Sequence, residues 1–116
     1  MPKQKLNPLP SAAFHILLAL ADEDRHGYGI MRQVAEQTEG RMRLGPGTLY
    51  SSIQSLLEAG LIAEVDARED ASLGQERRRY YRLTGAGRKL ASSEAERLAS
   101  LLRVARSKRI FRGEYV

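Results

Sequence analysis

The stretch that predicts the fold most clearly runs from Gly45 to Ile62 and reads GPGTLYSSIQSLLEAGLI. Pro46 suits the first turn of a helix and Gly60 suits the residue just past its end, so we expect a helix over about 46–59. At 3.6 residues per turn, its apolar side comprises Leu49, Ile53, Leu56 and Leu57. Its opposite side carries Thr48, Ser51 and Ser55, with Ser52 beside them. The helix therefore has one face for a core and one face of small polar side chains.

The outer face of this expected helix has no acidic side chain before Glu58, at its far end. Small polar side chains can enter a DNA groove and hydrogen-bond to base edges. The free N–H groups and the positive dipole end at a helix start also favour phosphate. We interpret the segment as a DNA recognition helix. The alternative is an ordinary solvated surface, although exposed helix faces are more often built from Lys and Glu.

The composition limits the class of protein. A chain of 116 residues that is 42% hydrophobic fits one modest globular domain. The formal net charge of +5 favours an anionic partner, although basicity alone is weak support. The chain has no cysteine, which excludes disulfides and thiolate metal sites. The longest apolar run, 16–21, is too short to span a membrane and no signal-peptide pattern is present, so we expect a cytoplasmic protein.

Three further helices are expected from the helical spacing of apolar residues and from capping residues. They cover about 11–22, about 27–38 with Gly40 at its end, and about 85–109 after the N-cap residue Thr84. The segment 41–44 is a connector that could also form a minimal strand.

Two β-prone segments, 61–65 and 77–83, flank a polar stretch that contains Gly74, which predicts a hairpin. Alternation along the second segment would point Tyr81 and Leu83 toward the core. The order of elements is thus helix, helix, helix, hairpin, long helix.

This order predicts a mainly α fold with a small β-hairpin. Three compact helices followed by a hairpin form a winged helix-turn-helix, to which a long C-terminal dimerisation helix is added. We expect residues 1–83 to form the DNA-binding domain with its N-terminal arm. Residues 84–116 would then form the dimerisation helix and a tail.

The sequence offers little for catalysis or for metal binding. His15 and His26 are the only histidines, and no third metal ligand lies near them in the sequence. No activated-nucleophile motif and no phosphate-cradling glycine loop is present. We therefore expect no metal, no cofactor and no enzymatic activity, with His15 packed in its helix and His26 in the turn before the next helix.

The candidate DNA-binding residues lie on the recognition helix, just before it, and on the second strand of the hairpin. They are Arg43, Gly47, Thr48, Tyr50, Ser51, Gln54, Arg77, Arg78 and Arg79. The arginines would hold backbone phosphate beside the groove. Alternation puts Arg78 on the opposite face from Arg77 and Arg79, and acids such as Glu76 are alternative partners for them. Gln54 could hydrogen-bond to a base or simply face solvent.

The expected C-terminal helix carries apolar residues at heptad spacing. The stripe consists of Ala91, Ala95, Leu98, Leu102 and Ala105, widened by Leu90, Leu101 and Val104. Because so small a core cannot cover the whole stripe, we expect these residues to form the interface of a homodimer. A two-fold dimer would place two recognition helices about one turn of DNA apart. The alternative is that the helix packs only on the first helix of its own subunit.

Several motifs together resemble the PadR family of bacterial transcriptional regulators. They are Phe14-His-Ile-Leu-Leu-Ala-Leu20, His26-Gly-Tyr-Gly-Ile30, Gly47-Thr-Leu-Tyr50 and Tyr81-Arg-Leu-Thr84 with Gly87. The Gly-Thr-Leu-Tyr element is the most specific of them. Winged helices of the MarR type share only the Leu-Thr-x-x-Gly ending.

The resemblance implies a homodimeric winged-helix repressor that binds an inverted repeat in double-stranded promoter DNA and is released by a small molecule or a stress signal. It also implies that the third helix enters the major groove while the wing grips the flanking backbone. With a single C-terminal helix, the chain is similar to the compact branch of the family. Some compact members bind flat aromatic drugs between tryptophans at the dimer interface. This chain has no tryptophan, so that mode of binding is not expected.

Two other classes of function compete with this interpretation. A winged helix that serves only as a protein-interaction module would be less basic and would have a more apolar outer face over 46–59. A small-molecule sensor whose DNA binding is vestigial would need an apolar cavity at the dimer interface, which a sequence does not reveal.

Overall fold

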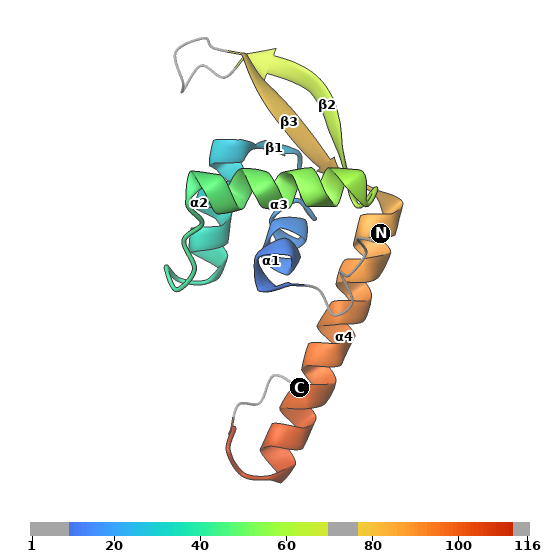
Figure 1. The fold of residues 1–116 in the computed structure, drawn as a ribbon. Helices are drawn as coiled ribbons and strands as arrows, with labels where there is room; N and C mark the ends of the chain where they lie inside the picture. Colours follow the sequence, from blue (N-terminus) through green and yellow to red (C-terminus); the bar gives the residue numbers. More distant parts are fainter. Residues whose placement is uncertain (1–9, 70–76, 113–116) are drawn as a thin grey trace.

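The computed structural model describes residues 10–69 and 77–112, and for residues 66–69 and 77 it describes the backbone alone. Its elements follow the expected order, with one additional strand (Figure 1). They are α1 (Ser11–Ala19), β1 (Arg25–His26), α2 (Gly27–Gln37), α3 (Pro46–Glu58), β2 (Ile62–Glu69), β3 (Arg77–Leu83) and α4 (Gly85–Ser107). The predicted class, a mainly helical winged helix-turn-helix with a long C-terminal helix, is confirmed.

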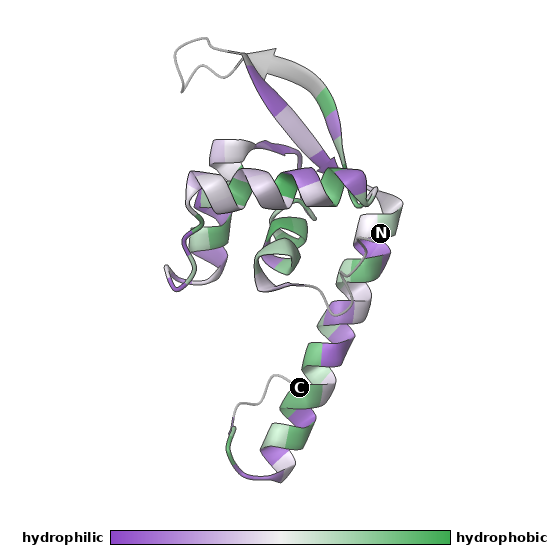
Figure 2. Cartoon of the chain, viewed as in Figure 1, coloured by the Kyte–Doolittle hydropathy of each residue, from purple (hydrophilic) through white to green (hydrophobic). Residues whose placement is uncertain are grey.

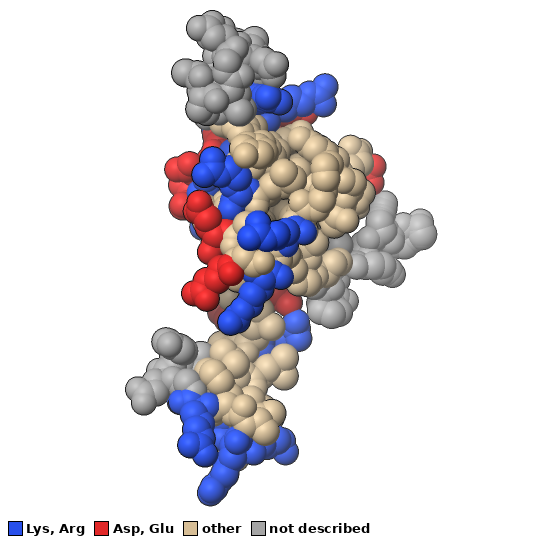
Figure 3. Space-filling view, turned by 90° about the vertical axis from the view of Figure 1, so that its left-hand side faces the viewer, with Lys and Arg blue, Asp and Glu red and all other residues tan. Residues whose placement is uncertain are grey.

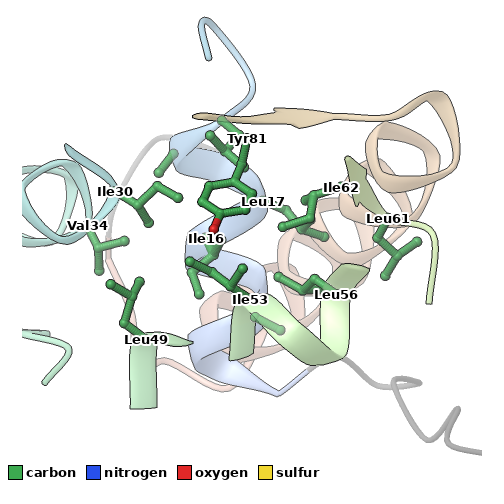
Figure 4. Close-up of a cluster of buried hydrophobic side chains, with 13 residues drawn as sticks. Ile16, Leu17, Ile30, Val34, Leu49, Ile53, Leu56, Leu61, Ile62 and Tyr81 are labelled. Atoms are coloured by element: carbon green, nitrogen blue, oxygen red, sulfur yellow. The ribbon is translucent and has the colours of Figure 1, made fainter. Parts of the chain in front are cut away.

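The hydrophobic core lies where α1, α2, α3 and the sheet meet (Figure 4). Its central side chains are Ile16, Leu17, Ile30, Val34, Leu49, Ile53, Leu56, Leu61, Ile62 and Tyr81. Burying one aliphatic side chain of this kind stabilises the fold by about 1.5–3 kcal/mol. Because Leu49, Ile53 and Leu56 anchor α3 from inside, its other face is held outward as a fixed surface.

The sheet is broader than the expected hairpin, because a short strand joins it on the far side of β3. The strand order is β1-β3-β2 and both pairings are antiparallel. His26 in β1 lies opposite Tyr80 in β3, and an ion pair of 2.9 Å between Asp24 and Arg82 fastens the same edge. A strand of two residues has no alternation to detect, so the sequence predicts only the hairpin.

The two long strands form the wing, which rises above α3 in Figure 1. Their register runs from Ile62 opposite Leu83 to Glu69 opposite Arg77, with an irregularity between Val65 and Arg68. Such an irregularity bends a strand and increases its twist. Tyr81 is buried, as the alternation predicts, and Leu83 packs against the core from a half-buried position.

Thr84 joins the end of α3, the sheet and the start of α4. Its hydroxyl donates a hydrogen bond of 2.8 Å to the carbonyl oxygen of Gly60, and its N–H donates to the carbonyl oxygen of Leu61. The same hydroxyl accepts the N–H of Gly87 at 3.0 Å, so the predicted N-cap is confirmed. Gly87 is buried against the Leu61 carbonyl, where a β-carbon would collide with that oxygen.

Within the part of the chain that the structure describes, α4 packs against the core through its first half. Leu90 and Ala91 pack against the core from half-buried positions, and the buried carboxylate of Glu94 pairs with Arg97. Beyond these residues α4 extends away from the three-helix body (Figure 1). Hydrophobic residues continue to recur along this extended part (Figure 2).

Some boundaries differ from the sequence prediction by a few residues. The helix α1 ends at Ala19 rather than near residue 22, and α2 ends at Gln37. Glu39 and Gly40 both have positive φ angles, of 55° and 82°, so the chain turns sharply there as Gly40 predicts. The connector 41–44 forms no strand. None of the helices in the described ranges combines the length and hydropathy needed to cross a bilayer.

Candidate nucleic-acid interface

The outer face of α3 is a polar surface held rigidly by the core beneath it. Its exposed residues are Gly47, Thr48, Tyr50, Ser51, Gln54 and Ser55, and Ser52 is half-buried. The helix begins with Pro46 after Gly45, and no side chain caps its first N–H groups. These groups thus remain available to an acceptor at the start of the helix.

Two side chains of this face already have partners. The Ser51 hydroxyl donates a hydrogen bond of 3.3 Å to the carbonyl oxygen of Thr48, one turn earlier. The Gln54 amide donates to the Glu58 carboxylate at 3.0 Å. Gln54 would have to leave Glu58 to donate to a base, whereas the exposed Thr48 hydroxyl is already at the start of the helix.

The wing arginines lie in different surroundings. The side chain of Arg79 is 74% exposed, and its Nε atom lies 3.4 Å from a carboxylate oxygen of Glu64 on the neighbouring strand. Arg78 is half-buried. The Arg77 side chain and the wing acids proposed as alternative partners lie outside the described residues. Local pairing of an arginine therefore does occur, but with Glu64.

A concavity, which we call the wing hollow, opens between the start of α2, the first half of α3 and β3. It has a volume of about 290 Å³ and is lined by His26, Gly27, Tyr28, Tyr50, Arg78, Arg79 and Tyr81. Although Arg78 and Arg79 are neighbours along β3, both line this hollow. Alternation alone would have assigned them to separate surfaces.

His26 and Tyr28 shape one side of the wing hollow. The Nδ1 atom of His26 accepts the N–H of Gly29 at 3.0 Å and so caps α2, as its predicted place in the turn suggests. The His26 ring meets Tyr80 edge-on and stacks loosely on Tyr28, with ring centres 5.2 and 6.5 Å apart. The sequence analysis did not identify Tyr28 or Gly27 as site residues, because nothing in their local pattern places them beside β3.

Tyr81 and Tyr50 contribute two more phenols to the same hollow. Burial raises the pKa of the Tyr81 hydroxyl and the charge of Glu64 raises it further, while Arg79 acts in the opposite direction. Tyr81 is therefore a neutral hydrogen-bonding group around neutral pH. The Tyr50 side chain is 53% exposed, and its ring lies over the backbone of Gly27.

A second, smaller hollow of about 180 Å³ contains the other arginine predicted to contact phosphate. Arg43 lines it together with Arg32 and the apolar side chains of Met31, Ala35 and Leu44. This hollow lies between α2 and the connector that leads into α3. Arg43 is exposed there, close to the start of the recognition helix.

The residues expected at a dimer interface fall into two groups. Leu90 and Ala91 pack against the core of their own subunit. The remaining ones lie along the extended part of α4, where Ala95, Leu98 and Leu101 are exposed and Leu102 and Ala105 are half-buried. Leu98, Leu101 and Val104 are 37%, 52% and 48% exposed, and such neighbouring exposed apolar side chains mark a candidate interaction surface.

The end of α4 is strongly basic. Exposed Arg and Lys side chains gather there, far from the wing (Figure 3); they are Arg103, Arg106, Lys108, Arg109 and Arg112. Figure 3 also shows basic side chains in the upper part of the view, where the wing lies. Within residues 10–69 and 77–112, no three histidine or acidic side chains cluster closely enough to hold a metal ion.

The site can now be compared with known proteins. The family model described as the transcriptional regulator PadR-like family matches residues 16–93, from the middle of α1 to the first half of α4. A PadR family transcription regulator from Clostridium difficile R20291 has a similar structure, with 26% identity and a TM-score of 0.72. That match covers 84% of this chain and 97% of the other.

Two further matches differ in what they cover. Bacillus subtilis PadR, solved in complex with operator DNA, is 18% identical with a TM-score of 0.60, over 72% of this chain and 45% of that one; this likeness concerns the fold alone. A 37.1 kDa protein of transposon TN4556 from Streptomyces fradiae is 38% identical over 86 residues. Those residues are 74% of this chain but only 22% of the transposon protein.

Proposed function

This chain belongs to the PadR-like family of transcriptional regulators, and from that premise we propose that it binds double-stranded promoter DNA as a homodimer and represses transcription. Membership of the family makes the chain a regulator of transcription rather than an enzyme. Two observations carry the proposal: the outer face of α3 presents small polar side chains, and Tyr50 of α3 lines the same hollow as Arg78 and Arg79 of the wing.

In the proposed complex α3 enters the major groove. Thr48 and Ser51 would meet base edges near the start of the helix, because small hydroxyls allow close approach and can donate or accept. Arg78 and Arg79 of the wing, and Arg43 before α3, would bind phosphates and fix the orientation of the protein. A fold relative, Bacillus subtilis PadR, was solved in complex with operator DNA, which supports DNA as the partner.

The homodimer would form through the extended part of α4. Leu98, Leu101 and Val104 expose apolar surface that their own subunit does not cover, and a second copy of the same stripe would bury it. A two-fold dimer would set the two α3 helices about 34 Å apart, which matches successive major grooves on one face of DNA. The proposed operator is accordingly an inverted repeat.

Release by a small molecule or a stress signal completes the proposal and rests on the family resemblance. A flat aromatic drug held between tryptophans is not part of it, because the chain has none. An effector that acts on this regulator would change the affinity of the dimer for DNA. Adding candidate compounds to the protein–DNA complex would reveal such an effector.

The test is fluorescence anisotropy of the purified protein on labelled DNA from upstream of its own gene, over a series of salt concentrations, with random duplex as competitor. We expect binding that resists the competitor and weakens with salt according to the number of phosphates contacted. Binding that is weak and indifferent to sequence would contradict the proposal. The protein-interaction module would then be the better interpretation.

A further inference from the structure

We propose that the wing hollow seats one phosphate group of the DNA backbone, next to the groove that α3 enters. This inference rests on the proposed function and assigns to it a binding site that includes residues outside α3 and the wing. Three separate segments build the hollow: the start of α2, Tyr50 of α3, and Arg78, Arg79 and Tyr81 of β3. Each supplies a group that can bind a phosphate oxygen.

The charge at the hollow favours an anion. Arg78 and Arg79 both line it, and a guanidinium presents several N–H donors in a planar fork that matches phosphate. Arg79 faces Glu64 through its Nε atom, at 3.4 Å. The volume of about 290 Å³ lies at the lower limit of typical small-molecule sites, which span roughly 300–1,000 Å³, and suits a small anionic group better than a drug-sized effector.

Phenol hydroxyls supply neutral donors around the same space. Tyr28 is 49% exposed, and its ring lies near both the His26 ring and the Arg32 guanidinium, whose carbon lies 5.9 Å from the ring centre. Tyr81 lines the hollow from β3 and keeps its proton, because burial raises its pKa. Phosphate bound by arginine together with tyrosine hydroxyls is a common arrangement at DNA backbones.

The position of the hollow identifies the anion as a DNA phosphodiester. Tyr50 belongs both to the hollow and to the outer face of α3, where Gly47 and Gln54 neighbour it at helical spacing. A duplex whose major groove receives α3 must therefore run its backbone past Tyr50 toward β3. Phosphate contacts of this kind fix the register of a protein on DNA without reading its sequence.

Glu64 allows a test in which a substitution is expected to strengthen DNA binding rather than weaken it. Its carboxylate pairs with Arg79 and would repel an incoming phosphate, so the free protein holds Arg79 in place at some cost to DNA affinity. Replacing Glu64 by glutamine removes that charge and keeps the side-chain size. If a phosphate enters the hollow, Glu64→Gln must bind DNA more tightly than the native chain.

The experiment compares variants of the full chain on one labelled duplex from upstream of its gene, by anisotropy over a salt series. Arg79→Gln is expected to weaken binding roughly tenfold and to lower the salt slope by about one. Tyr28→Phe is expected to weaken binding roughly threefold to tenfold with the slope unchanged, because no charge is lost. Arg103→Gln, the same charge loss on exposed α4, is the matched control.

Thermal melts establish that each variant is folded before its affinity is compared. If Arg79→Gln and Tyr28→Phe bind like the Arg103→Gln control, the hollow holds no phosphate although the protein still binds DNA. The same conclusion follows if Glu64→Gln fails to tighten binding. A native chain that binds no duplex at all would overturn the proposed function and this inference with it.

A set of duplexes with one phosphate replaced by a neutral methylphosphonate, position by position, gives a direct second measurement. At the seated position the native chain should lose affinity, and Arg79→Gln should lose nothing further there. At every other position, the loss of affinity caused by the methylphosphonate and the loss caused by Arg79→Gln should add. Additive losses at every position would overturn the inference even if Arg79 matters for binding.

Discussion

The phenol ring of Tyr50 in α3 lies so closely over the backbone of Gly27, the first residue of α2, that a β-carbon at residue 27 would overlap the Tyr50 hydroxyl. The glycine is needed for this contact and not for its backbone angle, because its φ lies outside the left-handed region. The contact couples two helices at the edge of the surface that we propose to face DNA.

Gly27→Ala tests this coupling. Because Tyr50 is half exposed, its ring can rotate away at little cost, so we expect the free energy of unfolding in urea to change by less than about 1 kcal/mol. The affinity for upstream DNA should nevertheless fall several-fold, because the hydroxyl leaves the wing hollow. Gly29→Ala is the control, since its β-carbon would meet side-chain atoms of His26 only at 3.5 Å. Equal affinities of the two variants would refute the coupling.

Gly87→Ala should act on stability instead. Here the atom in the way is the backbone carbonyl of Leu61, which cannot move aside without disturbing the junction at Thr84. We expect a loss of about 1–3 kcal/mol in the free energy of unfolding. Gly85→Ala, two residues earlier and with no neighbour within 4 Å of its β-carbon, should be neutral or stabilising by up to about 1 kcal/mol. Similar urea midpoints for both variants would contradict this account of Gly87.

Leu98→Glu should convert the proposed dimer into a monomer, because it places a charge in the middle of the apolar stripe on α4. Sedimentation velocity measures the change, and the monomer should bind upstream DNA far more weakly. Ser92→Glu, which adds the same charge at an exposed position of α4 outside the apolar stripe, should remain dimeric. A dimer that persists in Leu98→Glu would place the interface elsewhere.

Thr48→Ala and Ser51→Ala should reduce sequence preference more than general affinity. If each hydroxyl contacts a base edge, its loss costs about 0.5–1.5 kcal/mol on the cognate site and little on random duplex. Competition anisotropy with the two DNAs gives the ratio of the affinity for the cognate site to the affinity for random duplex. Ser92→Ala, at an exposed position of α4, serves as the control. Were both ratios to stay at the native value, bases would be read by other residues.

The helices could be predicted from the sequence because their signals are local. Pro46 and Gly60 bracket α3, and the observed helix, Pro46–Glu58, ends within one residue of the expected end. Thr84 caps α4 as expected, since capping depends on a single side chain and the N–H three residues on. The strand β1 could not be predicted, because its two residues extend only when β3 is beside them.

The wing hollow could not be predicted from the sequence either, because it depends on contacts between segments that are far apart along the chain. Tyr28, Tyr50 and Arg79 are separated by more than twenty residues in each case, and only the packing of α2, α3 and β3 brings them together. The heptad spacing on α4 likewise predicted an apolar stripe but did not indicate which surface packs against it. Leu90 and Ala91 continue that stripe but pack against their own core.

The hydrogen bonds of Thr84 have a mechanical consequence. They join the end of α3 and the start of α4 at a single residue, which couples the orientations of the two helices. The arm formed by the 23 residues of α4 is about 34 Å long at 1.5 Å per residue. A tilt of α4 by about 10° about its start at Thr84 would therefore move its far end by about 6 Å. In the proposed dimer, a small change in the tilt of α4 would therefore produce a large change in the distance between the two α3 helices.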